Sequence, residues 1–269
     1  MLSAVAALAL AGCAGRSAGS TGRFPSTNQD ALGGSEPAPV TTVLHPGATP
    51  PATSSPSTTT PVTGSRFGPS GYQPLWPFAS LAEAQEWQHG SGGHQPWHVD
   101  ADLTALAFTQ GYLGFQESDR VVRHTVGASD ARVAVGYESE GGRSSVSAVI
   151  HLVRFGTGGD APWEVVGTDD APDFTLETPR YGGTVSSSFR VGGIITGVDE
   201  SIVVEVRQTS SEAFLGRSCC VAAGGEGRPW HADVSFAGAH EPVLTVVAST
   251  GGHLKSVERF AVTAVRLPR

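Results

Sequence analysis

The sequence is short of positive charge and lacks two motifs that mark common enzymes. Its 269 residues contain 17 Lys and Arg against 25 Asp and Glu, a formal net charge of −8. Nucleic-acid binding requires a basic surface, so we expect no nucleic-acid partner. Neither His-Glu-x-x-His nor Gly-x-x-x-x-Gly-Lys-Ser/Thr occurs. These absences argue against the zinc proteases and P-loop nucleotide enzymes, and no cofactor is predicted.

Aromatic residues are also scarce, at 7% of the chain, and they lie mostly beyond the first seventy positions. Residues 14–71 consist almost entirely of Ser, Thr, Pro, Gly and Ala. Such a segment cannot bury enough apolar surface to offset the entropy lost when a chain becomes ordered. We therefore predict that residues 14–71 form a disordered stalk.

A short apolar run, residues 2–11, opens the chain and leads into Leu10-Ala11-Gly12-Cys13. A bilayer needs about 20 apolar residues to be spanned, so this run suits an export signal better than a membrane helix. Its ending resembles the lipobox of bacterial lipoprotein signal peptides. The resemblance implies that residues 1–13 are a signal peptide and lipobox and that Cys13 carries acyl chains such as palmitate. The mature protein would then be anchored on the extracytoplasmic face of the cell membrane.

Two helices are predicted where the aromatic residues begin. Ser80 and Glu83 have capping-box spacing, which predicts a helix over residues 81–88. Asp100 or Asp102 is placed to cap a second helix. The apolar residues of that helix recur at helical spacing: Leu103, Leu106, Ala107 and Tyr112 or Leu113.

Period-two alternation follows the helices and predicts four strands. They span residues 120–126, 131–138, 145–155 and 162–167. Two helices followed by an antiparallel sheet indicate an α+β domain over residues 72–170.

Residues 167–173 contain turn formers and three aspartates, which marks a boundary between two domains. A calcium-binding loop would need more carboxylates at regular offsets. The acidic segment is therefore interpreted as a solvated interdomain turn.

Short alternating strands separated by Gly-rich turns occupy residues 173–269, which predicts an all-β sandwich. The opening residues of this region form a pattern: Pro179, Gly182 or Gly183, Val185, Ser187, Phe189, Val191 and Gly193. The pattern resembles the signature of the bacterial spore germination immunoglobulin-like domain. That family usually has proline before the phenylalanine, whereas this chain has Ser188. The resemblance implies an immunoglobulin-like sandwich and an envelope setting, but no particular reaction.

Cysteine is rare, with three in the chain, and two of them are the neighbours Cys219 and Cys220. With Cys13 acylated, these two are the thiols that remain for a bridge. Neighbouring Cα atoms lie about 3.8 Å apart, below the usual disulfide range of roughly 4.4 to 6.8 Å. Two interpretations stay open, a strained bridge in a loop and two partly buried free thiols. Catalysis with His231 or His240 as base is disfavoured because no glycine stands beside the thiols.

A second cluster of chemically capable residues surrounds a Gly-rich loop. It contains His89, His94, His98 and Asp100, which are ligand types that zinc uses. Their spacing matches no metal motif, so these side chains are interpreted as solvated or bonded to the backbone. His94, His98 and Asp100 remain the candidates if a metal is bound.

Two classes of function fit these observations. The favoured one is a non-catalytic lipoprotein that acts as a binding or structural module of the cell envelope. Its partner would be an envelope protein or a cell-wall polymer. The alternative is a metal-dependent envelope enzyme with its site near His94, His98 and Asp100 in the α+β domain.

Overall fold

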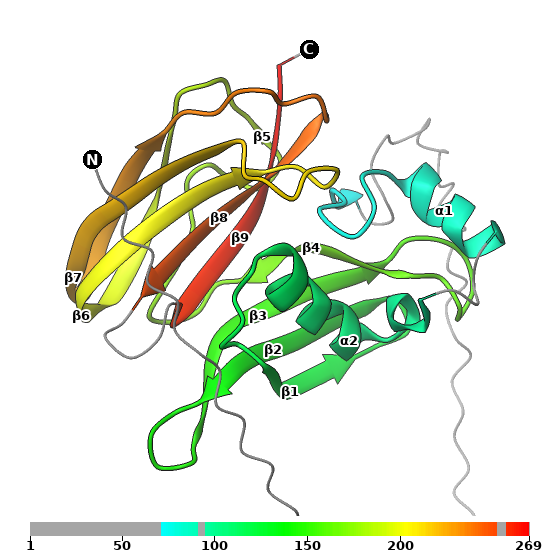
Figure 1. The fold of residues 1–269 in the computed structure, drawn as a ribbon, viewed down its shortest axis with the longest axis horizontal. Helices are drawn as coiled ribbons and strands as arrows, with labels where there is room; N and C mark the ends of the chain where they lie inside the picture. The colour runs from blue at the N-terminus through cyan, green and yellow to red at the C-terminus, as the bar shows by residue number, and fades with distance from the viewer. Residues whose placement is uncertain (1–70, 91–94, 252–256, 269) are drawn as a thin grey trace, which may run out of the picture. The chain divides into compact units, whose positions relative to one another are not determined.

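Two β-sheets and two short helices form the part of the chain that the computed structural model describes, residues 71–90, 95–251 and 257–268 (Figure 1). The predicted signal peptide and all of the predicted stalk except Gly71 lie outside these ranges. Within them, no helix is long and apolar enough to cross a membrane. Helices followed by mostly antiparallel sheets confirm the coarse prediction of an α+β region followed by an all-β region. The immunoglobulin-like identity of the second region stays a prediction.

The first helix, α1 (Leu81–Gly90), begins at the predicted capping box. The Oγ of Ser80 accepts a hydrogen bond from the Glu83 backbone N–H at 3.2 Å. The Glu83 carboxylate in turn accepts one from the Ala79 backbone N–H at 2.9 Å. Two of the N–H groups that a helix start leaves without partners are thereby satisfied. Ala84 is buried on the inner face of α1.

The second helix, α2 (Ala101–Leu106), lies between a 3-10 turn, η2 (Pro96–Val99), and a π-helical turn, η3 (Ala107–Tyr112). Asp100 is its cap, because the carboxylate accepts the Leu103 backbone N–H at 3.0 Å. Leu103 belongs to the predicted apolar repeat, but it is 50% exposed. The buried face follows a helical repeat that begins two positions earlier: Ala101, Thr104, Ala105 and Phe108. Its alanines have small side chains, which allow the helix to lie close against the sheet.

The four predicted strands form the first sheet, and their bounds agree with the sequence to within one or two residues at each end. The strands are β1 (Arg120–Val126), β2 (Asp130–Glu138), β3 (Ser144–Arg154) and β4 (Trp163–Asp169). They are antiparallel and adjacent in chain order. Figure 1 shows α2 lying across one face of this sheet. Alternate side chains of β3 point to opposite faces of the sheet: Ile150 packs with α2, and Val153 packs with Ala84 of α1.

The second sheet comes from the region after residue 173. Its strands are β5 (Gly183–Thr184), β6 (Phe189–Arg207), β7 (Gly216–Val234), β8 (Val243–Gly251) and β9 (Arg259–Arg266). They lie in the order β5-β9-β8-β6-β7. β5 runs parallel to β9, and the other pairings among these strands are antiparallel.

β8 and β9 are buried on both faces, and one of these faces packs against the first sheet. Along β8, Val246 packs within the second sheet, whereas Val247 packs with the first sheet and α2. Along β9, Ala261 packs within the second sheet, and Val262 packs with the first sheet and α2. The two predicted regions, 72–170 and 173–269, therefore each supply one sheet but share apolar contacts. All described residues belong to one compact unit.

Candidate functional site

The predicted metal candidates do not converge in the described residues. His94 lies outside them, and the Asp100 carboxylate caps α2. His98 is 3% exposed, so of the two predicted states, solvated or bonded to the backbone, the solvated one is wrong for this residue. Its ring stacks on Trp97, and its Nε2 lies 2.8 Å from the Gln95 Oε1. Burial lowers the pKa of His98 to about 4. Throughout the described ranges, no three His, Cys, Asp or Glu side chains gather as a metal site.

Two carboxylates of the acidic segment 167–173 form ion pairs with arginines. Asp169 accepts from the Nε of Arg132 at 2.7 and 2.9 Å. Asp173 accepts from the Nη1 of Arg259 at 3.0 Å. A calcium ion at either carboxylate would have to displace a guanidinium group. These contacts therefore argue against a calcium-binding loop in this segment.

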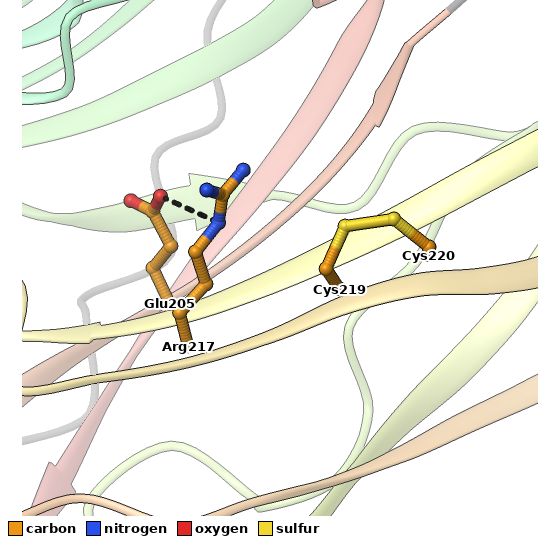
Figure 2. Close-up of a disulfide and its surroundings, with 4 residues drawn as sticks. All are labelled: Glu205, Arg217, Cys219 and Cys220. Atoms are coloured by element: carbon orange, nitrogen blue, oxygen red, sulfur yellow. Dashed lines mark ion pairs between the residues drawn. A yellow bond between two sulfur atoms is a disulfide. The ribbon is translucent and has the colours of Figure 1, made fainter.

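The two neighbouring cysteines form a disulfide, with their Cα atoms 3.7 Å apart. Figure 2 shows the pair on β7, next to Glu205 and Arg217. Cys219 and Cys220 are both exposed and lie within a strand. The predictions of partly buried thiols or of a bridge in a loop were therefore wrong about the location. The reason is a bulge in β7 that carries both residues at a sheet edge.

A polar groove with a volume of about 570 Å³ is the best candidate for a functional site. The residues that line it are Trp76, Gly111, Tyr112, Thr209, Ser210, Ser211 and Glu212. They come from three separate parts of the chain: the segment before α1, the turn η3 and the segment that follows β6. The groove therefore combines an aromatic side with a side of hydroxyl and carboxylate groups.

The aromatic side is a set of contacting rings. Trp76 stacks on Trp97 with the ring centroids 5.2 Å apart and the planes at 16°. On its other neighbour, Tyr112, the centroids are 6.1 Å apart. Trp76 is fixed through its backbone too, because its carbonyl accepts the Val165 N–H at 2.7 Å. Such contacts hold the indole in one orientation.

Tyr112 contributes its ring rather than an acidic hydroxyl. Burial raises the pKa of Tyr112 to about 12, although the Thr245 hydroxyl and the charge of Arg207 act in the opposite direction. The hydroxyl therefore stays protonated at neutral pH. Arg207 also donates to the Tyr112 carbonyl at 2.9 Å, which holds η3 against the end of β6.

The polar side is held by a buried carboxylate. Glu241, 8% exposed, accepts the backbone N–H of Thr209 at 2.9 Å and that of Ser210 at 2.7 Å. The Oγ1 of Thr209 donates to the Leu75 carbonyl at 2.8 Å. Bonds to a charged acceptor are stronger than neutral ones, so the loop is rigid before any ligand arrives.

His240 contacts the hydroxyl group of Ser210 through its ring. The ring Nε2 lies 3.0 Å from the Ser210 Oγ, and Nδ1 lies 2.8 Å from the Nε2 of Gln208. The Gln208 amide is oriented by its Oε1, which accepts the His240 backbone N–H at 3.1 Å. Its NH₂ group then faces the ring, 2.8 Å from Nδ1 and 3.2 Å from Nε2, while the Gly238 carbonyl lies 3.3 Å from Nδ1. Either ring nitrogen can carry the proton in this arrangement, so the ring accepts from the Ser210 hydroxyl in one tautomer and donates to it in the other.

Sequence reasoning missed this groove. Residues 208–212 are a polar run directly after an apolar strand, which predicts a turn but no ligand. Trp76 has no local sequence motif that indicates a ligand, and His240 was considered only as a base for a cysteine. Their proximity depends on the contacts between the two sheets, which no local pattern encodes. No protein-family model matches this chain and no curated protein sequence matches it, so the functional proposal rests on the groove and on the sequence motifs.

Proposed function

We propose that this protein is a lipid-anchored, extracytoplasmic lipoprotein whose folded part binds a glycan segment of a cell-wall polymer. The anchor is Cys13 in the lipobox-like ending, and the binding site is the groove beside Trp76. Residues 14–71 act as the tether between the two. Residues 173–269 belong to the immunoglobulin-like class that their opening pattern resembles, and the protein is a binding module rather than an enzyme.

The observation that carries this proposal is an ordered aromatic ring beside fixed hydroxyl groups. A sugar ring has apolar C–H faces and polar edges, so it suits a site that offers both kinds of surface. Trp76 supplies the apolar surface, and Ser210 and Thr209 line the opposite side. Their positions are already set by Trp97 and Glu241. Little ordering entropy is lost on binding when a site is organised in advance.

The charge of the groove and of the whole chain indicates which kind of wall polymer can bind. The groove contains Glu212, an exposed residue, and no lysine or arginine lines it. The whole chain carries a formal net charge of −8. Like charges oppose association, so the ligand is a neutral or amino-sugar glycan rather than a phosphate-rich polymer.

Removal of the aromatic side should weaken glycan binding most. We expect Trp76→Ala to raise the dissociation constant for purified wall glycan by about tenfold or more, because the indole is the main apolar contact. Ser210→Ala should raise it by roughly threefold to tenfold through loss of one hydrogen bond. Isothermal titration of the full chain measures both constants.

The control is Leu103→Ala, which removes an exposed apolar side chain on α2, outside the groove. This variant should bind like the wild type. Absence of glycan binding by the wild type, or equal binding by Trp76→Ala, would contradict the proposal. Circular dichroism establishes that each variant is folded.

The anchor has its own test. We expect Cys13→Ala, expressed from the natural start of the gene, to move the protein from the membrane fraction into the medium. The reason is that acyl chains provide the membrane affinity. Cys219→Ala removes a cysteine without touching the lipobox and should stay in the membrane fraction. Immunoblots of the fractions decide, and membrane retention of Cys13→Ala would refute the anchor.

A further inference from the structure

The disulfide between Cys219 and Cys220 lies where another molecule can reach it. β7 is the end strand of its sheet, and none of the described strands pairs with its outer edge. Ser218 pairs with Val204 and Val221 pairs with Ile202, so the two cysteines together oppose a single residue of β6. This is a β-bulge, a feature that twists an edge and redirects side chains. Both cysteines are exposed.

The backbone at the bulge departs from that of an ordinary strand. Cys220 has a φ of 69°, in the left-handed region that residues other than glycine rarely adopt. Such conformations persist where surrounding bonds hold them, and they gather at functional sites. Opening of the disulfide would remove one of the covalent constraints on Cys220.

A positively charged side chain, Arg217, lies on the same strand as the disulfide. Figure 2 shows the Arg217 side chain on the side of β7 that carries the two sulfur atoms. Arg217 precedes Cys219 by two residues, and 46% of its side chain is exposed. Its Nε lies 3.6 Å from Glu205, but that carboxylate also binds Arg207 at 2.8 Å. The guanidinium carbon of Arg217 lies 5.8 Å from the centre of the Phe214 ring. Two guanidinium groups share one carboxylate, so a net positive charge remains on the face of β7 that carries the sulfurs, and a positive charge near a cysteine favours its thiolate.

We propose that Cys219 and Cys220 are a reversible thiol–disulfide exchange site that accepts electrons from an external dithiol. A thiolate of the donor attacks the sulfur of Cys220, the Cys219–Cys220 bond breaks, and Cys219 leaves as a thiolate next to Arg217. The second donor thiol loses its proton and attacks the donor sulfur of the mixed disulfide, and Cys220 leaves as a thiolate. The donor ends as a disulfide, and the protein pair ends as two thiols after taking up two electrons and two protons.

The test uses the full chain with Cys13→Ser, so that the pair provides the remaining two cysteines. Dithiothreitol is the dithiol probe, iodoacetamide caps free thiols, and intact mass counts the caps. We expect no cap before reduction and two after it, with the circular dichroism spectrum unchanged. Oxidised dithiothreitol should then restore the uncapped state in samples that were not alkylated.

The role of the cation is tested by rate. Arg217→Gln should slow reduction by roughly threefold to tenfold at low salt, because the leaving thiolate loses its positive neighbour. Arg228→Gln is the matched control, since it removes an exposed arginine of β7 farther along the strand, and it should leave the rate unchanged. Caps without reductant, caps that appear only in denaturant, or unfolding on reduction would each overturn the proposal. Equal rates for Arg217→Gln and the wild type would overturn the assignment of Cys219 as leaving group.

Discussion

Replacement of Arg207 by methionine should lower the free energy of unfolding by about 3 kcal/mol, because it breaks a buried ion pair from one side. Arg207 is 7% exposed at the end of β6. Its Nε and Nη2 donate to the Glu205 carboxylate at 3.0 and 2.8 Å. The variant would leave that carboxylate largely buried, with Arg217 at 3.6 Å as its remaining ion-pair partner.

The same side chain also connects the second sheet to the turn η3. Its Nη1 donates to the carbonyl of Tyr112 at 2.9 Å, and its guanidinium carbon lies 5.6 Å from the centre of the Tyr112 ring. Both contacts connect β6 to the turn η3, which is part of the groove. Arg207→Met should therefore weaken glycan binding as well as stability, since Tyr112 loses its support.

Urea denaturation followed by circular dichroism measures this effect. Arg190→Met is the control, because Arg190 and Asp233 form a pair in which each side chain is 61% exposed. Exposed pairs contribute little, so this variant should unfold at the wild-type midpoint. Adding Glu205→Leu to Arg207→Met should recover part of the loss by removing the unpaired charge. A midpoint for Arg207→Met equal to that of Arg190→Met would show that the buried pair is not important.

Local features of the chain were readable from the sequence where local physics decides them. Ser80 was identified as a cap, and Asp100 as one of two candidates with Asp102, because a cap and its N–H partner lie within four residues of each other. The four strands of the first sheet followed from period-two alternation. Leu103 was misplaced because helical spacing defines a periodic stripe but not which side of the helix meets the sheet.

The features that the sequence did not reveal depend on distant contacts. Residues 244–248 read Leu-Thr-Val-Val-Ala, a nearly continuous apolar run, which is the one local sign that β8 is covered on both faces. The groove brings Trp76 and Tyr112 to the segment at Ser210, from which they are 134 and 98 positions distant in the sequence. The location of the cysteine pair was missed because a bulge depends on the register between β6 and β7.

The last prediction concerns Glu164, a carboxyl group with no exposed surface at the start of β4. Burial raises the pKa of Glu164 well above its ordinary value, although the backbone N–H groups of Phe78 and Trp76 act in the opposite direction. The Phe78 N–H donates to its Oε2 at 3.3 Å. The folded protein therefore keeps this group protonated at a pH at which the unfolded chain has released the proton.

The sign of the pH dependence follows from that difference. Below the ordinary glutamate pKa both states are protonated, so the group does not make stability depend on pH. Above it, the unfolded state binds fewer protons than the folded state, and stability falls by about 1.4 kcal/mol for each pH unit. The fall continues until the pH reaches the raised pKa of the folded protein.

Glu164→Gln keeps the shape of the side chain and cannot ionise, so it should remove this loss. We expect the variant to match the wild type near pH 4 and to become progressively more stable than the wild type as the pH rises toward neutrality. Glu86→Gln, an exposed position on α1, is the control and should follow the wild type at every pH. Urea midpoints across this pH range measure the difference. A gap between Glu164→Gln and the wild type that stays constant with pH would mean that the folded and unfolded states release this proton at the same pH, which would contradict the raised pKa of Glu164.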